Sequence, residues 1–160
     1  LVKFNPKGKI RIRFSLMPQH KADIHEPHTS KIIDRIKAID TFIEAGYDVH
    51  VNFSPILVYK NWLHDYSYLF SLMNEHVKNK ENVLSECIFL THNYERHKLN
   101  LKYNPLTEVD LWVPSIQEDK ESQYGGINRR YRRNLKYSYI KEFKDLHKRK
   151  IPWNKIRYIF

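Results

Sequence analysis

Cations and aromatic rings are interleaved in residues 129–139, which read Arg-Arg-Tyr-Arg-Arg-Asn-Leu-Lys-Tyr-Ser-Tyr. Arginine and lysine neutralise phosphates, and a tyrosine ring can stack on a base or wedge into a duplex. We interpret the segment as a β-hairpin with Asn134 near its tip that contacts nucleic acid. In the alternative interpretation, the tyrosines pack on the core while the cations face water. The candidate contact residues are Arg130, Tyr131, Arg132, Arg133, Lys136 and Tyr139.

The net charge of +10 is concentrated in the same part of the chain. Residues 1–127 hold 16 Lys and Arg against 16 Asp and Glu, whereas residues 128–160 hold 12 against 2. A localised excess of cations indicates a surface for a polyanion, either nucleic acid or an anionic membrane. The alternative is a solvated basic helix that binds nothing.

Histidine and cysteine patterns are weaker signals. His25 and His28 lie three positions apart and His92 and His97 five apart, but no carboxylate or cysteine completes a ligand set at a known spacing. The sequence therefore predicts no metal site, and it assigns no catalytic residue. His92 is kept as a possible pocket residue because it lies at a predicted strand end. Cys87 begins an apolar run and is interpreted as a buried, inert thiol.

The composition is that of one folded domain. The chain has 160 residues, of which 41% are hydrophobic and 14% aromatic, which excludes a disordered chain. No apolar run is long enough to span a bilayer, and we expect no membrane partner. A single cysteine excludes a disulfide framework and fits a cytoplasmic location. The first residue is Leu1 rather than methionine, which is compatible with a piece of a longer protein.

Strand and helix patterns alternate along most of the chain. The predicted strands cover residues 9–15, 49–53, 87–90 and 155–160. The predicted helices cover residues 32–43, 61–77, 95–103 and 141–150. We expect Thr29 or Ser30 to cap the first helix and Gly46 to end it.

Such alternation is typical of parallel strands joined by crossover helices, in an open sheet or a partial barrel. Ligands then gather beyond the C-terminal ends of the strands. The predicted ends are Ser15, then Ser54 and Pro55, then Thr91 and His92.

Short motifs follow one another along the chain in a defined order. They are Phe14-Ser15, Glu26-Pro-His-Thr-Ser30, Ala45-Gly-Tyr47, Ser54-Pro-Ile56, Asn61-Trp62 with Tyr66, Thr91-His92, Arg130-Tyr131, Lys136-Tyr-Ser-Tyr139 and Arg157-Tyr158-Ile-Phe160. Their order and spacing, from about Lys9 to Phe160, resemble the C-terminal half of the spore photoproduct lyase family. Members of that family are radical SAM enzymes that repair ultraviolet-damaged DNA.

The resemblance implies an α/β fold, namely the C-terminal part of a partial (β/α)6 radical-SAM-type barrel. Residues 1–122 would form half of the barrel. Residues 123–160 would add the basic hairpin, a helix and a closing strand to the same domain. Ser15 would contact S-adenosylmethionine, and Ser54 and Pro55 would line the same pocket.

The resemblance also implies a DNA partner. The hairpin would enter ultraviolet-damaged DNA and hold a flipped-out thymine dimer, with Arg130, Tyr131 and Lys136 contacting the lesion or its backbone. The function expected for the intact protein is therefore the repair of thymine dimers by a radical SAM lyase.

The sequence departs from the family pattern in three ways. The CxxxCxxC motif that holds the 4Fe–4S cluster is absent, so this chain alone would not be the enzyme. Either the chain is a fragment whose partner is its own N-terminal half, or it has no radical chemistry. His28 stands where the family has glycine, and residues 132–135 replace a glycine-rich turn. Two alternatives follow: a non-catalytic nucleic-acid-binding module of this fold, or a radical SAM relative with another substrate.

Overall fold

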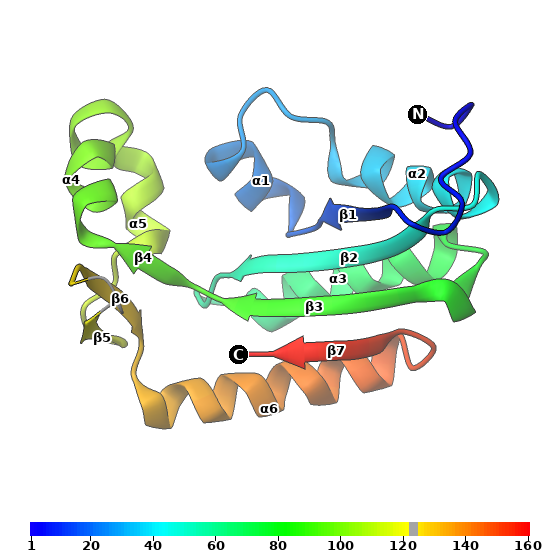
Figure 1. Ribbon diagram of the computed structural model, residues 1–160. Helices are drawn as coiled ribbons and strands as arrows, with labels where there is room; N and C mark the ends of the chain where they lie inside the picture. The colour runs from blue at the N-terminus through cyan, green and yellow to red at the C-terminus, as the bar shows by residue number, and fades with distance from the viewer. Residues whose placement is uncertain (122–124) are drawn as a thin grey trace.

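Four parallel strands form the main sheet of the structure, a computed structural model that describes residues 1–121 and 125–160. Their order across the sheet is β1-β2-β3-β7 (Figure 1). The strands are β1 (Arg11–Ser15), β2 (Asp48–Ile56), β3 (Val83–Phe89) and β7 (Lys155–Ile159). The predicted α/β class with parallel strands is confirmed.

Strand β2 shows how the sequence pattern builds the core. Val49, Val51 and Phe53 are 0% exposed and belong to one hydrophobic cluster. Asn52 lies between them in sequence, and successive side chains of a strand point to opposite faces of the sheet. One face of the sheet is therefore apolar, and the other carries polar side chains.

Three long helices pack against the apolar face. They are α2 (Ile32–Glu44), α3 (Trp62–His76) and α6 (Arg133–Lys150), and a shorter helix α1 (Gln19–His25) follows β1. Phe143 of α6 makes edge-on ring contacts with Phe53 of β2 and Phe70 of α3. These contacts join two helices and the sheet in one core, which includes Ile36 and Ile39 of α2.

The ends of α2 are partly as predicted. Gly46 follows the helix with a φ of +86°, the left-handed conformation that glycine adopts most easily. The predicted cap by Thr29 or Ser30 is wrong, because Lys31 is the N-cap residue and its side chain makes no capping bond. Instead the backbone N–H of Ile32 donates to the side chain of Gln19 in α1 (2.7 Å).

A second, antiparallel sheet lies beyond the C-terminal ends of the main strands, where the arrowheads in Figure 1 point. Its order is β4-β6-β5, and only Leu90 separates β3 from β4. The sheet contains β4 (Thr91–Asn93), β5 (Gln117–Glu121) and β6 (Ile127–Tyr131). Helices α4 (Tyr94–Tyr103) and α5 (Glu108–Leu111) lie beside it, and short 3-10 helices cover Lys80–Asn82 and Pro105–Thr107.

The basic hairpin predicted over residues 129–139 is wrong in its position. The hairpin strands are β5 and β6, and α6 begins at Arg133 rather than at residue 141. The two tyrosines at 137 and 139 suggest the two-residue period of a strand. The half-buried and buried side chains of this segment recur about every four residues instead, at Leu135, Tyr139 and Phe143, which is the period of a helix.

The division of the chain between residues 122 and 123 falls outside the described residues. The described elements on the two sides of this division belong to one sheet, since β7 pairs with β3.

Within residues 1–121 and 125–160, no helix is both long and apolar enough to cross a membrane.

Candidate functional site

The C-terminal ends of β1 and β2 meet at one edge of the main sheet because the strands are parallel. Ser15 ends β1 and is the register partner of Asn52 in β2. Ser54 and Pro55 follow on β2, which continues through their cis peptide bond to Ile56. The three residues predicted to face the cofactor are thus on neighbouring strands at the same edge, and their role stays a prediction.

Arg35 of α2 fixes the loop that follows this edge. Its guanidinium donates to the backbone oxygen of Ser15 (2.9 Å), to the carboxylate of Glu26 (2.7 Å) and to the hydroxyl of Thr29 (2.6 Å). A shallow hollow of about 590 Å³ lies between this loop and the strand end, with Ser15 and Arg35 in its lining. The loop keeps a left-handed residue where the family has glycine, because His28 has a φ of +67°.

Asn52 presents an unsatisfied acceptor beside Ser15. Its Oδ1 atom is buried and has no hydrogen-bond partner among the described residues. A buried polar atom without a partner costs free energy, so such atoms are usually satisfied by a ligand or by water. This edge of the sheet can therefore accept a hydrogen bond from a polar ligand.

A basic pocket of about 360 Å³ lies where the N-terminus of α6 meets the end of β7. Its polar side chains are Arg130 of β6 and Arg133, Lys136 and Tyr137 of α6. Its apolar lining is Ile140, Ile159 and Phe160. The predicted residues Arg130, Arg133 and Lys136 are thus brought together, although from a strand and a helix rather than from one hairpin.

The electrostatics of this pocket favour an anion. Burial, together with the nearby charges of Arg130 and Lys120, lowers the pKa of Lys136. The first turn of α6 contains no acidic residue, and a helix N-terminus itself carries a partial positive charge. An anion that entered the pocket would relieve the repulsion among these cations.

Three of the arginines in residues 129–139 already have partners. Arg129 forms an ion pair with Asp119 (2.8 Å) and Arg130 with Glu118 (3.0 Å), across the β5–β6 pair. Arg132 donates to the backbone oxygen of Gln117, at the start of β5, and to that of Pro114 in the preceding loop. The local excess of positive charge is therefore smaller than the composition of residues 128–160 suggests.

Two predicted contact residues face the core. Tyr131 is 1% exposed, its hydroxyl accepts the backbone N–H of Val58 (2.8 Å), and burial raises its pKa. Tyr139 packs edge-on against the rings of Trp62 and Tyr131. We do not retain either as a base-stacking residue. Tyr137, which the predicted set leaves out, is 61% exposed and lines the basic pocket.

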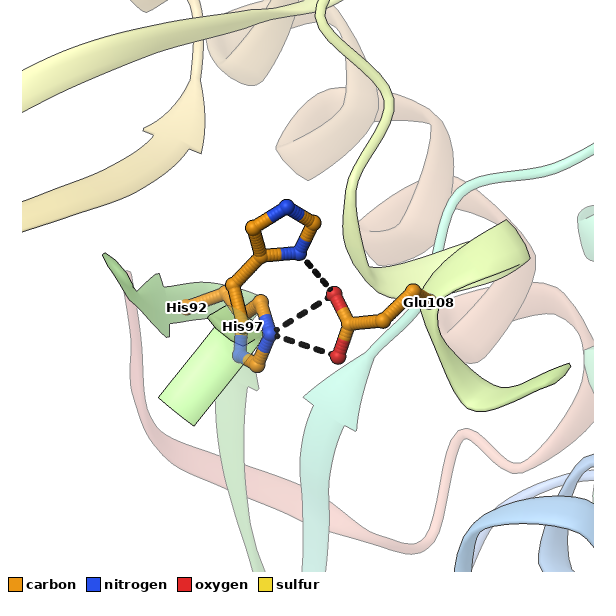
Figure 2. Close-up of side chains that lie close together, drawn as sticks. All are labelled: His92, His97 and Glu108. Atoms are coloured by element: carbon orange, nitrogen blue, oxygen red, sulfur yellow. Dashed lines mark hydrogen bonds and ion pairs between the residues drawn. The ribbon is translucent and has the colours of Figure 1, made fainter. Parts of the chain in front are cut away.

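His92 belongs to a second cluster, with His97 and Glu108 (Figure 2). Strand β4 carries His92, the first turns of α4 carry His97, and α5 begins with Glu108. The Nε2 atom of His92 lies 3.0 and 3.1 Å from the two carboxylate oxygens, and the Nδ1 atom of His97 lies 2.5 Å from Oε2. The sequence singles out both histidines but not Glu108, because Glu108 lies eleven positions beyond His97, after a 3-10 helix.

Glu108 is a buried carboxylate that stays ionised. Burial alone would raise its pKa, but hydrogen bonds from His97 and Asn100 and the neighbouring His92 outweigh burial and lower the pKa. Trp112 stacks on the His97 ring with centroids 3.8 Å apart. These are the described residues that could hold a metal ion, contrary to the expectation from sequence spacing.

Comparisons with known proteins agree with one another. The sequence model of the spore photoproduct lyase family matches residues 1–160. The spore photoproduct lyase of Bacillus subtilis (strain 168) is 33% identical over 67 residues, which cover 42% of this chain and 20% of that protein.

Solved structures of spore photoproduct lyase are also similar. A variant with bound AdoMet and dinucleoside spore photoproduct has a TM-score of 0.86 at 21% identity, over 96% of this chain and 45% of that chain. A complex with dinucleoside spore photoproduct has a TM-score of 0.83 at 22% identity, with the same coverage. The chain thus spans less than half the length of the proteins it matches, and the likeness to the solved structures is one of fold.

Proposed function

We propose, since the chain belongs to the spore photoproduct lyase family, that it supplies the C-terminal part of a radical SAM enzyme that repairs thymine dimers in DNA. In this proposal it acts in the cytoplasm on ultraviolet-damaged DNA. The observation that carries the proposal is the basic pocket at the N-terminus of α6, beyond the ends of the parallel strands.

The pocket suits a DNA phosphate. Arg133 and Lys136 have no acidic partner in an ion pair that the structure describes, and both line the pocket. Arg130 adds a third cation, already shared with Glu118. The exposed ring of Tyr137 is placed to stack on an unpaired base. A flipped-out lesion would therefore meet phosphate-binding cations and an aromatic ring in one place.

The strand-end edge suits AdoMet (S-adenosylmethionine). The hydroxyl of Ser15 and the unsatisfied Oδ1 of Asn52 can bond the amino and hydroxyl groups of such a ligand. Ser54 and Pro55 would line the same pocket from the next residues of β2. When bound, AdoMet supplies an adenosyl group for radical chemistry, whereas these residues only bind and orient it.

This chain does not supply ligands for a 4Fe–4S cluster. Its one cysteine, Cys87, is 0% exposed in the core, and burial raises the pKa of the thiol to about 12. Cluster ligation needs several thiolates. In this proposal the ligands of the cluster belong to an N-terminal half that completes a partial barrel.

The polar face of the main sheet supports a partner of that kind. Glu86 and His50 are buried on it, and Arg13 lies beside them. In a partial barrel these side chains would face the interior.

The second candidate function is a nucleic-acid-binding module without catalysis. The buried position of Cys87 favours this function for the chain by itself, because a buried thiol is not available as a cluster ligand.

A binding experiment tests the DNA surface. Fluorescence anisotropy would compare an irradiated with an undamaged oligonucleotide, for the parent chain and for Arg133→Ala and Lys136→Ala. We expect each substitution to weaken binding and to reduce the slope of log K against log salt by about 0.7–0.9, because one phosphate contact is lost. The matched control is Lys148→Ala, an exposed lysine of the same helix outside the pocket.

Equal effects of Lys148→Ala and Lys136→Ala would contradict the proposed DNA-binding pocket, because binding would then follow net charge alone.

A calorimetric titration with AdoMet separates the two candidate functions. Weaker AdoMet binding by Ser15→Ala supports the enzyme, whereas DNA binding with no AdoMet binding supports the module.

A further inference from the structure

We propose that His92, His97 and Glu108 bind a divalent first-row transition ion, with Zn²⁺ as the representative, which fastens α4 and α5 to β4. The ligand atoms are Nε2 of His92, Nδ1 of His97 and a carboxylate oxygen of Glu108, all within 4.8 Å of one another. The proposed site is separate from the basic pocket and does not depend on the proposed function.

The three side chains converge from three elements onto one point. Figure 2 shows a nitrogen of each imidazole directed at the carboxylate, with one ring from β4 and the other from α4. Two imidazoles and a carboxylate hold Zn²⁺ in several catalytic sites, with water in the fourth position. Here the same ligand set is proposed to hold an ion with a structural role. Imidazole ligands favour zinc and similar ions over Mg²⁺ and Ca²⁺, which prefer oxygen.

The separations between the imidazole nitrogens and the carboxylate oxygens can be compared with those of a tetrahedral site. Bonds of about 2.0–2.1 Å at tetrahedral angles place neighbouring ligand atoms about 3.3 Å apart. The contacts of His92 Nε2 with the two oxygens, at 3.0 and 3.1 Å, nearly match that spacing. The 2.5 Å contact of His97 must open by about 0.8 Å when the ion binds.

Charge also favours a cation at this point. Glu108 is 5% exposed, and the ion pairs described for it involve only the two histidines. A buried ionised carboxylate needs a compensating charge. A bound dication supplies that charge and leaves both histidines neutral, so that each offers a nitrogen lone pair.

Neighbouring groups hold the ligands in place before an ion arrives. The amide of Asn100 donates to the Oε1 atom of Glu108. The Trp112 ring lies parallel to the His97 ring, with 12° between their planes, and Arg129 covers Trp112 with its guanidinium 4.5 Å from the ring centroid. Such surrounding contacts orient metal ligands and raise affinity.

The ion would also stiffen the small sheet. His92 is the register partner of Arg129, next to Arg130 on β6, so a fixed His92 fixes the strand that carries one side of the basic pocket. The site is structural in this proposal, and the ion takes no part in a reaction.

The test is a titration of the chelator-treated 160-residue chain with ZnCl₂, followed by calorimetry, and with CoCl₂, followed by visible absorption. We expect one ion per chain and cobalt bands of tetrahedral intensity. Glu108→Gln keeps the size of the side chain but removes its charge, and it should weaken Zn²⁺ binding more than about 100-fold. Asn100→Ala should weaken it about tenfold, since Asn100 only positions Glu108.

The control is His64→Gln, which removes an imidazole that is 84% exposed and should leave the affinity unchanged. Circular dichroism of each metal-free variant would verify folding, and the cobalt spectrum of the parent chain needs no variant at all. Absence of zinc binding by the parent chain, an equal affinity of Glu108→Gln, or equal binding of Mg²⁺ would each overturn the proposal. The cluster would then be a hydrogen-bonded network only.

Discussion

Glu86 gives the sharpest test of how the main sheet is held together. Its carboxylate accepts hydrogen bonds from Arg13 (2.8 Å) on β1, His50 (3.1 Å) on β2, and Arg157 (2.9 Å) and Tyr158 (2.8 Å) on β7. Because Glu86 itself lies on β3, one side chain connects all four strands. We predict that Glu86→Gln destabilises the fold through loss of the negative charge.

The magnitude follows from the pKa of the group. Burial alone would raise the pKa of Glu86, but hydrogen bonds from Arg13, Tyr158 and His50 lower it from 4.5 to about 2. At 1.36 kcal/mol for each pKa unit, this lowering corresponds to at most about 3.4 kcal/mol. The side chains of Arg13 and Arg157 are 50% and 40% exposed, so solvent screens the interaction and we expect about 1–2 kcal/mol.

The sign of the pH dependence is fixed by the direction of the shift. A carboxylate with a lowered pKa in the folded state stabilises the fold above its unfolded pKa of about 4.5 and loses that contribution as the pH falls towards 2. Urea denaturation should give the full deficit of Glu86→Gln at about pH 7, and less than half of it at about pH 3.

A deficit that stays constant between these pH values would refute the electrostatic account, because a packing defect does not titrate. No deficit at neutral pH would refute it as well. Arg11→Gln is the matched control, since it removes an exposed partner of Asp48 at the edge of the same sheet and should cost less than about 1 kcal/mol.

Two further predictions concern buried polar contacts. Tyr131→Phe should lower the unfolding free energy by about 1–3 kcal/mol, because the N–H of Val58 loses its acceptor. Urea denaturation measures that loss. If the folded variant also bound DNA more weakly, Tyr131 would reach the ligand, contrary to its buried position. Asn154→Ala should cost about 2–4 kcal/mol, because the carbonyl of Val83 and the ring of His147 both lose a buried partner. A cost below about 0.5 kcal/mol would mean that water replaces the amide.

The elements that the sequence predicts well are those whose pattern is local. Val49, Val51 and Phe53 alternate with polar residues, and Ile36 and Ile39 recur at helical spacing, so β2 and α2 follow from the chain alone. The parallel arrangement follows from the alternation of strand and helix. It predicts that Ser15 ends a strand beside its parallel neighbour, as β1 and β2 show, without any knowledge of contacts.

The elements that the sequence does not predict depend on distant partners. Strand β5 reads Gln-Glu-Asp-Lys-Glu, which has no strand character of its own. It pairs with β6, whose arginines neutralise Glu118 and Asp119. Local charge counts therefore overstate the free positive surface.

The candidate sites show the same limit. Glu108 joins His92 and His97 only because the 3-10 helix Pro105–Thr107 and α5 fold back on α4, and no rule of ligand spacing in sequence predicts that fold. The basic pocket combines a strand, a helix and the end of β7. The sequence identifies three of its cations but assigns them to one hairpin, because Tyr137 and Tyr139 have the two-residue spacing of a strand.

The pairing of β3 with β7 bears on how the molecule folds and how it can vary. Glu86 and Tyr158, which join the two strands, lie 72 positions apart in the chain. The loop that they close contains the whole second sheet together with α4, α5 and α6. Doubling the length of such a loop costs only about 0.6 kcal/mol of closure entropy, whereas long-range pairing slows folding. Insertions and deletions in the second sheet should therefore change the folding rate more than the stability of the main sheet, which leaves the end of the molecule that carries the proposed sites free to diverge.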